Sequence, residues 1–250
     1  MTMFTSEERE TLRAHLVAAA QADEHIIAAA HIGSMAAGRL DRWSDIDLAL
    51  SLAPGSDRDE VVTVWNDRMY RQHRALAHLD VPRGTTLYRV FLLDTTLQVD
   101  LSFWDAEEFG ARGPAFRLIF GSANERSLRG VEPHELVGLG WVYALHVRSN
   151  LARGRLWQAE YRLSEMREAV LKLACLRHGV PESEGRGWDD LPGEVTAPLE
   201  AALVRSLDAP ELRRAFGVTM TALLVELRQV DGELAQRLTG PLLTLQESEF

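Results

Sequence analysis

The hydrophobic pattern of the 250-residue chain changes near residue 130. Before that point, short runs alternate polar and apolar residues or are continuously apolar, as in β-strands that cover a core. After it, long segments have the spacing of amphipathic helices, and no strand pattern is present. The sequence therefore predicts an α+β fold, with a small mixed-sheet domain over residues 1–130 and an all-helical bundle over residues 131–250.

The first half opens with a helix signal. Thr5 and Glu8 have the spacing of a capping box, which predicts a helix from there to about Ala22. The further elements that we expect are strands over 25–32 and 45–52, a helix over 57–78, and strands over 85–93 and 96–104. Glycine and proline residues interrupt any regular pattern between residues 105 and 130.

Four helices are expected in the second half. Pro133 suits the first turn of a helix, Gly154 interrupts the pattern, and Gly179 and Pro181 are stop signals. The expected helices cover residues 133–153, 155–177, 198–207 and 210–238, and a loop rich in glycine, proline and acidic residues covers 181–193.

The composition excludes several classes of protein. Hydrophobic residues make up 46% and charged residues 26%, which is ordinary for a soluble globular chain. A single cysteine, Cys175, excludes an intramolecular disulfide framework and any site built from several thiolates. No run of about 18 uncharged apolar residues predicts a transmembrane helix. The acidic first residues do not resemble a secretory signal, so we expect a cytoplasmic location.

The formal net charge is -10, from 27 basic and 37 acidic residues. This balance argues against a nucleic-acid binder, which needs a basic surface. It suits a cationic partner, although acidic residues also serve solubility. The acidic excess is spread over both halves, so charge marks neither half as a polyanion-binding domain.

Two carboxylates stand close together in the strand expected over 45–52. Asp45 and Asp47 are two positions apart, so their side chains project from the same face. Like charges at short range raise each other's pKa and make the arrangement costly. A divalent cation resolves the repulsion, and Mg²⁺ commonly binds through one or two carboxylates together with substrate phosphates.

Two further features belong to the same site. Gly33 and Ser34 end one strand and open a short helix, where backbone N–H groups favour phosphate and a glycine permits close approach. Asp100 lies on a later strand, with Val99 and Leu101 on the opposite face. If that strand pairs beside the first, three carboxylates converge. Asp100 then serves as a third metal ligand or as a general base that accepts the proton of an attacking hydroxyl.

This pattern resembles the nucleotidyltransferase superfamily with the DNA polymerase β type of catalytic domain. The matching residues are Ile32-Gly33-Ser34, then a gap of ten, then Asp45-Ile46-Asp47-Leu48, and the later apolar-Asp-apolar strand at Asp100. Within the superfamily, the chain is similar to the small antibiotic nucleotidyltransferases that act on aminoglycosides and lincosamides. Those enzymes also place a helical bundle after the catalytic domain. Residues 141–175 look like the helix pair of the lincosamide type.

The resemblance implies an enzyme that transfers a nucleoside monophosphate, most often AMP from ATP, to a hydroxyl of a small acceptor. An aminoglycoside or lincosamide is the candidate acceptor, which would make the protein an antibiotic-resistance enzyme. Asp45 and Asp47 would bind Mg²⁺, with Asp100 as the base or a third ligand. Gly33 and Ser34 would hold the nucleotide phosphates. The acceptor would lie in a cleft between the two halves.

Three polar residues are further candidates for nucleotide contacts. Ser44 matches the small polar residue that often precedes the first aspartate in this superfamily. Arg39 lies in the segment between Ser34 and Asp45, within reach of a triphosphate. Lys172 is the candidate for a basic residue contributed by the helical half. Both basic residues also have an ordinary interpretation, as an exposed loop arginine and a snorkelling surface lysine.

Two other hypotheses remain. The same chemistry could modify a protein or a tRNA end, as in toxin–antitoxin nucleotidyltransferases, although the acidic charge argues against tRNA. Alternatively, the chain could be a non-catalytic binding protein on the same fold, although the three aspartates speak against this. The oligomeric state stays open.

Overall fold

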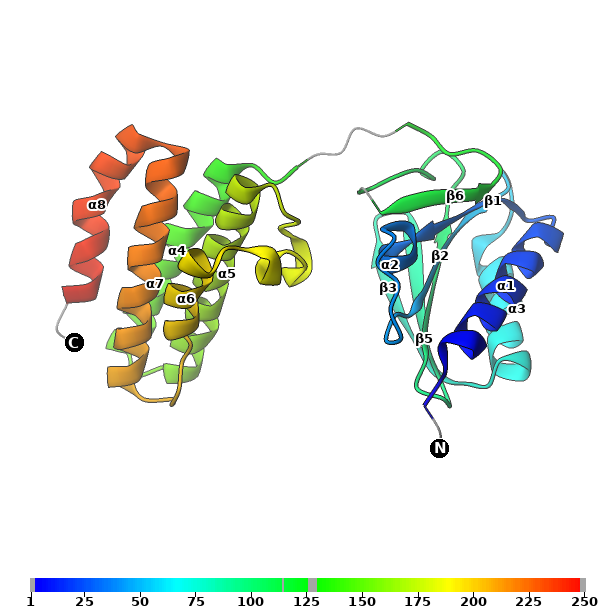
Figure 1. The fold of residues 1–250 in the computed structure, drawn as a ribbon, viewed down its shortest axis with the longest axis horizontal. Helices are drawn as coiled ribbons and strands as arrows, with labels where there is room; N and C mark the ends of the chain where they lie inside the picture. The colour runs from blue at the N-terminus through cyan, green and yellow to red at the C-terminus, as the bar shows by residue number, and fades with distance from the viewer. Residues whose placement is uncertain (1–2, 114, 126–129, 248–250) are drawn as a thin grey trace. The chain divides into compact units, whose positions relative to one another are not determined.

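The computed structural model describes residues 3–113, 115–125 and 130–247. The chain divides into two compact units, Met1–Arg129 and Gly130–Phe250. The first unit holds a six-stranded mixed sheet with helices, and the described part of the second unit holds helices without a strand (Figure 1). The α+β fold class expected from the sequence is confirmed.

The sheet has the strand order β3-β4-β5-β2-β1-β6. Only β2 and β5 run parallel, and the other neighbouring strands are antiparallel. The elements of this unit are α1 (Ser6–Ala22), β1 (Ile26–Ile32), α2 (Gly33–Ala36), β2 (Ile46–Leu52), α3 (Arg58–Gln72), β3 (Ala75–Arg83), β4 (Thr86–Leu93), β5 (Gln98–Trp104) and β6 (Phe116–Phe120).

The capping box at α1 is confirmed: the Thr5 hydroxyl accepts from the Glu8 backbone N–H at 3.1 Å, and the Thr5 N–H donates to the Glu8 carboxylate at 2.7 Å.

The two faces of the sheet differ in how they are covered. On one face, Leu48 of β2 and Leu101 of β5 pack in the core with residues of α1 and α3, including Leu16 and Trp65. On the other face a smaller cluster forms around Trp104, and no described helix joins its buried members. Because strand residues alternate between faces, the side chains at Asp47 and Asp100 lie on this second face.

The helix expected over 57–78 is wrong in its last six residues. Helix α3 ends at Gln72, Arg74 adopts a positive φ of 59°, and β3 follows. Strand β3 is the edge of the sheet and most of its residues are exposed, so it lacks the alternation by which a half-buried strand is recognised. Pro82 lies in this edge strand, where a missing N–H is tolerated. Strand β6, at the other edge, was likewise not foreseen.

The second unit contains α4 (Pro133–Ala152), α5 (Leu156–His178), α6 (Gly193–Ala201), α7 (Ala209–Val230) and α8 (Gly232–Glu247), with short 3-10 turns at Ser183–Gly185 and Trp188–Asp190. One hydrophobic core joins them, with Leu163, Met166, Met220 and Leu223 fully buried. The first two helices match expectation. None of the described helices combines the length and the apolar character that crossing a bilayer requires.

The last two expected helices need correction. The helix expected over 198–207 covers Gly193–Ala201 and carries Pro198 inside it. The helix expected over 210–238 is two helices, because Asp231 has extended backbone and its carboxylate accepts from the Leu234 N–H at 2.8 Å. An aspartate in that position is a helix N-cap. The pair Asp231-Gly232 is therefore the sequence signal for the break.

Candidate functional site

Asp45, Asp47 and Asp100 come together where the parallel strands β2 and β5 begin. Asp47 is paired in register with Asp100, and Asp45 directly precedes β2. One carboxylate oxygen from each residue lies within 4.8 Å of the others, and all three side chains are partly exposed. Oxygen ligands in such a cluster suit a hard divalent cation. The convergence of three carboxylates that the sequence suggested is therefore present in the fold.

The environment of Asp100 changes its acidity. Burial raises the pKa of this carboxyl to about 6, the hydrogen bond from Gln98 acts in the opposite direction, and the charge of Asp45 raises the pKa further. Gln98 Nε2 donates to Asp100 Oδ1 over 3.0 Å. Asp100 therefore takes up a proton far more readily than a free carboxylate does, while it remains mostly ionised at neutral pH.

Removing the Asp100 charge is expected to stabilise the metal-free protein. A pKa raised on folding contributes stability that is present at low pH and is lost as the pH rises through about 6. Asp100→Asn should raise the Tm at pH 7.5 by about 2–4 °C, equivalent to ~1 kcal/mol in a chain of this size, since solvent at the partly exposed site keeps the effect small.

Thermal unfolding followed by circular dichroism in EDTA measures this effect. The gain in Tm should shrink as the pH is lowered from 7.5 to 4.5, because the wild-type carboxyl is then protonated in the folded state. A lower Tm for the variant at pH 7.5, or a difference that does not depend on pH, would contradict the prediction.

The Asp47 carboxylate lies so close to the backbone of residue 33 that glycine is the residue that fits there. Its φ is +64°, and a Cβ added there would lie 2.1 Å from Asp47 Oδ2. The sequence argument assigned this glycine to the approach of a phosphate, whereas the structure places the aspartate against it. Ser34 follows at the start of α2, and its Oγ is buried without a hydrogen-bond partner among the described residues.

Cationic side chains lie behind α2, on the face of the sheet that α1 covers. Arg13 of α1 is 3% exposed, and its Nη1 lies 3.5 Å from Sδ of Met35 in α2. His31 of β1 is also buried, and burial lowers its pKa to about 4, with further lowering by Arg13 and Arg117. Arg13 is ion-paired with Glu10 of the same helix, and burial together with the nearby guanidinium groups leaves His31 neutral at pH 7.

Arg9 holds the segment that leads into Asp45. This arginine of α1 is 4% exposed, and its Nη1 donates to the backbone carbonyls of Asp41 and Ser44, the latter over 3.1 Å. Within the segment, the Asp41 carboxylate accepts from the Trp43 N–H at 2.8 Å and from the Ser44 hydroxyl at 3.0 Å. Arg9 is thus a positioning residue for the first aspartate of the cluster.

Loss of the Arg9 guanidinium should loosen this segment. Arg9→Met is expected to lower the free energy of unfolding by about 1.5–3 kcal/mol, the usual contribution of a hydrogen bond from a charged group. We also expect weaker binding of a divalent cation by the aspartate cluster, because Asp45 is no longer held. Chemical denaturation and calorimetric titration with Mg²⁺ measure the two effects.

Arg58 offers a matched control, because its Nη1 donates over 2.9 Å to the carbonyl of Thr85 at another turn of the same unit. Arg58→Met should leave the affinity for Mg²⁺ unchanged. An equal shift in both variants would show that Arg9 has only a general structural role.

The remaining candidates occupy different positions. Arg39 is exposed, and its backbone N–H donates to the Ser34 carbonyl at 3.0 Å. The Ser44 hydroxyl is engaged with Asp41, as described above. Lys172 lies on α5 of the second unit, with its Nζ 2.6 Å from Glu168 Oε1. Sequence reasoning missed Gln98 and Arg9. Gln98 could have been found, since it is two positions before Asp100 on the same strand face, but nothing in the sequence marks Arg9.

Comparison with known proteins gives limited similarity. No family model matches the chain, and no curated protein matches its sequence. Among solved structures, the chain is similar to an aminoglycoside 6-adenyltransferase from Bacillus subtilis, with 12% identity over 96% of this chain and 98% of that chain and a TM-score of 0.42. It is also similar to the polymerase core of TRAMP, an RNA surveillance complex, with 13% identity over 99% and 85% of the two chains and a TM-score of 0.30. Similarity at these identities and TM-scores assigns neither substrate nor residue roles to this chain.

Proposed function

We propose that the protein is a Mg²⁺-dependent nucleotidyltransferase that transfers a nucleoside monophosphate to a hydroxyl of a small acceptor. The observation that carries this proposal is the cluster of Asp45, Asp47 and Asp100, whose oxygens lie within 4.8 Å of one another beside Gly33. Like charges held this closely are costly unless a cation neutralises them. A cluster of this kind is therefore more easily explained by metal-dependent chemistry than by a structural role.

The residues of the site fit a magnesium ion. Carboxylate oxygens are hard ligands of the kind that Mg²⁺ prefers, and Mg²⁺ is usually held by one or two carboxylates and by phosphate oxygens of a substrate. Asp45 and Asp47 would hold the ion. When bound, it would neutralise charge at the reacting phosphoryl group. Burial raises the pKa of Asp100 to about 6, which favours a role in proton transfer for this residue.

In the proposed reaction, the acceptor hydroxyl attacks the α-phosphorus of a nucleoside triphosphate. A new P–O bond to the acceptor forms, the bond to the β-phosphate oxygen breaks, and pyrophosphate leaves with the electron pair. Asp100 accepts the hydroxyl proton, for which a pKa of about 6 is well matched to neutral pH. Gln98 orients the Asp100 carboxylate through the hydrogen bond to Oδ1.

We propose that Gly33 and Ser34 contact the nucleotide phosphates, and the Ser34 hydroxyl is the observation that supports this. The Ser34 hydroxyl has no partner among the described residues, and Arg13 lies against Met35 of the same helix. A phosphate oxygen of a triphosphate would satisfy the hydroxyl, and Arg13, although paired with Glu10, keeps Nη2 without a hydrogen-bond partner among the described residues. We propose Arg39, Ser44 and Lys172 as further nucleotide contacts. Their separate replacement tests each role.

The acceptor that we propose is an aminoglycoside or a lincosamide. The net charge of -10 favours association with a cationic molecule, and both classes carry amine and hydroxyl groups. The experiment is a matrix of the four common ribonucleoside triphosphates against a panel of both antibiotic classes, with Mg²⁺, in which pyrophosphate release is measured. Mass spectrometry should show an acceptor that has gained one nucleoside monophosphate.

The test separates the alternatives. Transfer of an α-labelled nucleotide to a protein or RNA band of a cell extract, with no labelled small product, would favour a macromolecular acceptor. Absence of Mg²⁺–nucleotide binding by calorimetry would overturn the proposal and leave a non-catalytic binding protein. Chelation by EDTA should abolish transfer, and restored Mg²⁺ should recover it.

A further inference from the structure

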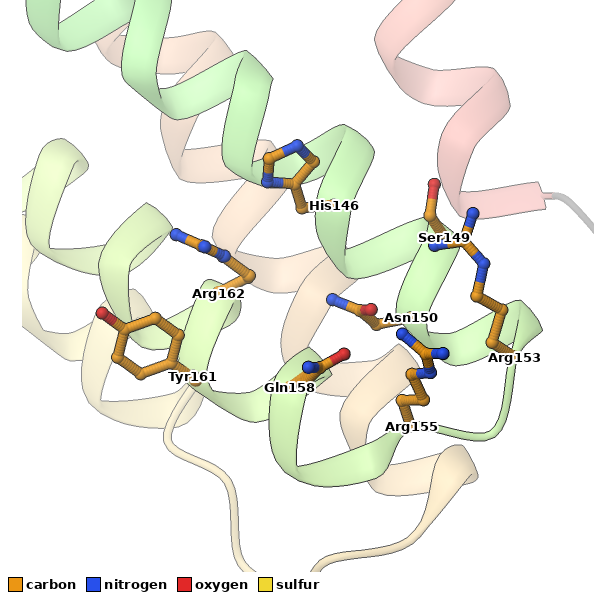
Figure 2. A pocket seen from close by; sticks show the side chains of 8 residues that line it. All are labelled: His146, Ser149, Asn150, Arg153, Arg155, Gln158, Tyr161 and Arg162. Carbon is orange, nitrogen blue, oxygen red and sulfur yellow. The ribbon is translucent and has the colours of Figure 1, made fainter.

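A polar cavity of about 400 Å³ lies at the turn between α4 and α5, within the second unit (Figure 2). The turn is formed around Gly154, whose φ is +65°, and the backbone N–H groups of Arg153 and Arg155 both donate to the Asn150 carbonyl, at 3.2 and 2.9 Å. Arg153 and Arg155 therefore flank Gly154 in this turn. Both side chains border the same cavity.

The cavity is lined by cations without a matching anion. Arg153, Arg155 and Arg162 line it, and none of its described lining residues is a carboxylate. Arg162 has an ion pair with Glu165, with 2.6 Å between Nη1 and Oε2. Within the described part of the chain, Arg153 and Arg155 have no side-chain hydrogen bond or ion pair. Two guanidinium forks are therefore free to bind a ligand.

The positive charge of the arginines at this cavity contrasts with the negative net charge of the chain. The net charge is -10, and the half that contains the cavity is itself acidic. A set of arginines within a concave site, in an otherwise acidic bundle, is not explained by solubility. Arginine is the residue best suited to phosphate groups, because its planar fork donates two parallel hydrogen bonds to two oxygens.

The neutral residues of the cavity complete a recognition surface. Asn150, which is buried, and Gln158 present amide groups between the arginines, and His146 presents an imidazole from α4 (Figure 2). The volume is at the lower end of the range for small-molecule sites. Together, forked cations and amides in a space of this size favour a compact polyanion.

We propose that this cavity binds a small molecule through a chain of at least two phosphoryl groups. The site belongs to the helical unit and uses none of the carboxylates of the first unit, so it stands independently of the proposed transfer reaction. The two unpaired arginines bind adjacent phosphoryl groups, and Arg162, already paired with Glu165, contributes a weaker contact.

The test uses the full chain in EDTA and inorganic pyrophosphate as the probe. Without divalent cations the aspartate cluster repels this anion, so calorimetry reports on other sites. Pyrophosphate should bind the wild type, and the double variant Arg153→Gln/Arg155→Gln should lose at least about tenfold in affinity. Inorganic phosphate should bind at least about tenfold more weakly than pyrophosphate, because it occupies only one of the two forks.

A matched control removes the same charge elsewhere in the unit. Arg213 and Arg237 are exposed on α7 and α8, so Arg213→Gln/Arg237→Gln should keep the wild-type affinity. Loss of affinity in both double variants would show a general effect of net charge and overturn the site. Absence of pyrophosphate binding, or unchanged binding in Arg153→Gln/Arg155→Gln, would also overturn it. Phosphate binding as tight as that of pyrophosphate would overturn the two-phosphoryl assignment.

Discussion

Asp47→Asn is expected to reduce nucleotide transfer by at least about 10²–10³-fold, the loss that follows removal of one electrostatic contact at a reacting centre. Asp47 is central to the cluster, because it is in register with Asp100 and lies against Gly33. Asparagine keeps the shape of the side chain and removes one of the charges that would hold a metal ion. Steady-state kinetics at saturating Mg²⁺ and nucleotide measure the loss.

The fold should not suffer from this substitution. Without metal, the loss of one of three close carboxylates relieves repulsion, so the Tm in EDTA should not fall. Asp67→Asn is a suitable control, because Asp67 is an exposed aspartate of α3 whose ion pair with Arg71 spans 3.0 Å. Surface pairs of this kind contribute little. Wild-type activity in Asp47→Asn would rule out the proposed chemistry at this cluster.

Gly33→Ala should also inactivate the protein, for a steric reason. The new Cβ would lie 2.1 Å from Asp47 Oδ2, so the carboxylate or the start of α2 must shift. Displacement of a reacting group by about 1 Å costs roughly 100-fold in rate. In addition, an alanine with positive φ costs roughly 1–2 kcal/mol of stability. Activity and chemical denaturation should be measured together.

Gly38 separates the two contributions of this substitution. It has nearly the same φ, +67°, but an added Cβ meets no atom within 4 Å. Gly38→Ala should therefore show the loss of stability that belongs to the backbone conformation and keep its activity. If Gly33→Ala retains as much activity as Gly38→Ala, the close packing of Gly33 on Asp47 has no catalytic importance.

The buried strands of the fold could be predicted from the sequence, whereas the edge strands and the helix break at Asp231 could not. Strand β2 was recognised because Ile46, Leu48 and Leu50 alternate with residues of the other face, a direct consequence of burial against α1 and α3. Strand β3 cannot be recognised from the sequence, because its side chains lie at an exposed edge and carry no core pattern. A helix break at Asp231 was missed because a single capping carboxylate competes with a continuous amphipathic pattern.

The same contrast applies to the site. The convergence of the three aspartates could be predicted, because strand geometry places alternate residues on one face, but the packing of Asp47 against Gly33 could not. Arg9 could not, since its function depends on α1 packing beside a segment far away in the sequence. The arginines at the α4–α5 turn become a site only when two helices form one cavity around them.

The parallel pairing of β2 and β5 also couples ligand binding to folding. Asp47 and Asp100 are neighbours in register, yet α3, β3 and β4 separate them along the chain. The cluster therefore does not exist in the unfolded chain, and a cation that bridges both strands binds only the folded one. Its binding adds to the free energy of unfolding in proportion to the logarithm of its concentration above Kd. If the cluster holds a divalent ion as proposed, the metal-free form of this unit would be the less stable one. The resistance of the unit to unfolding would then measure occupancy without nucleotide or acceptor.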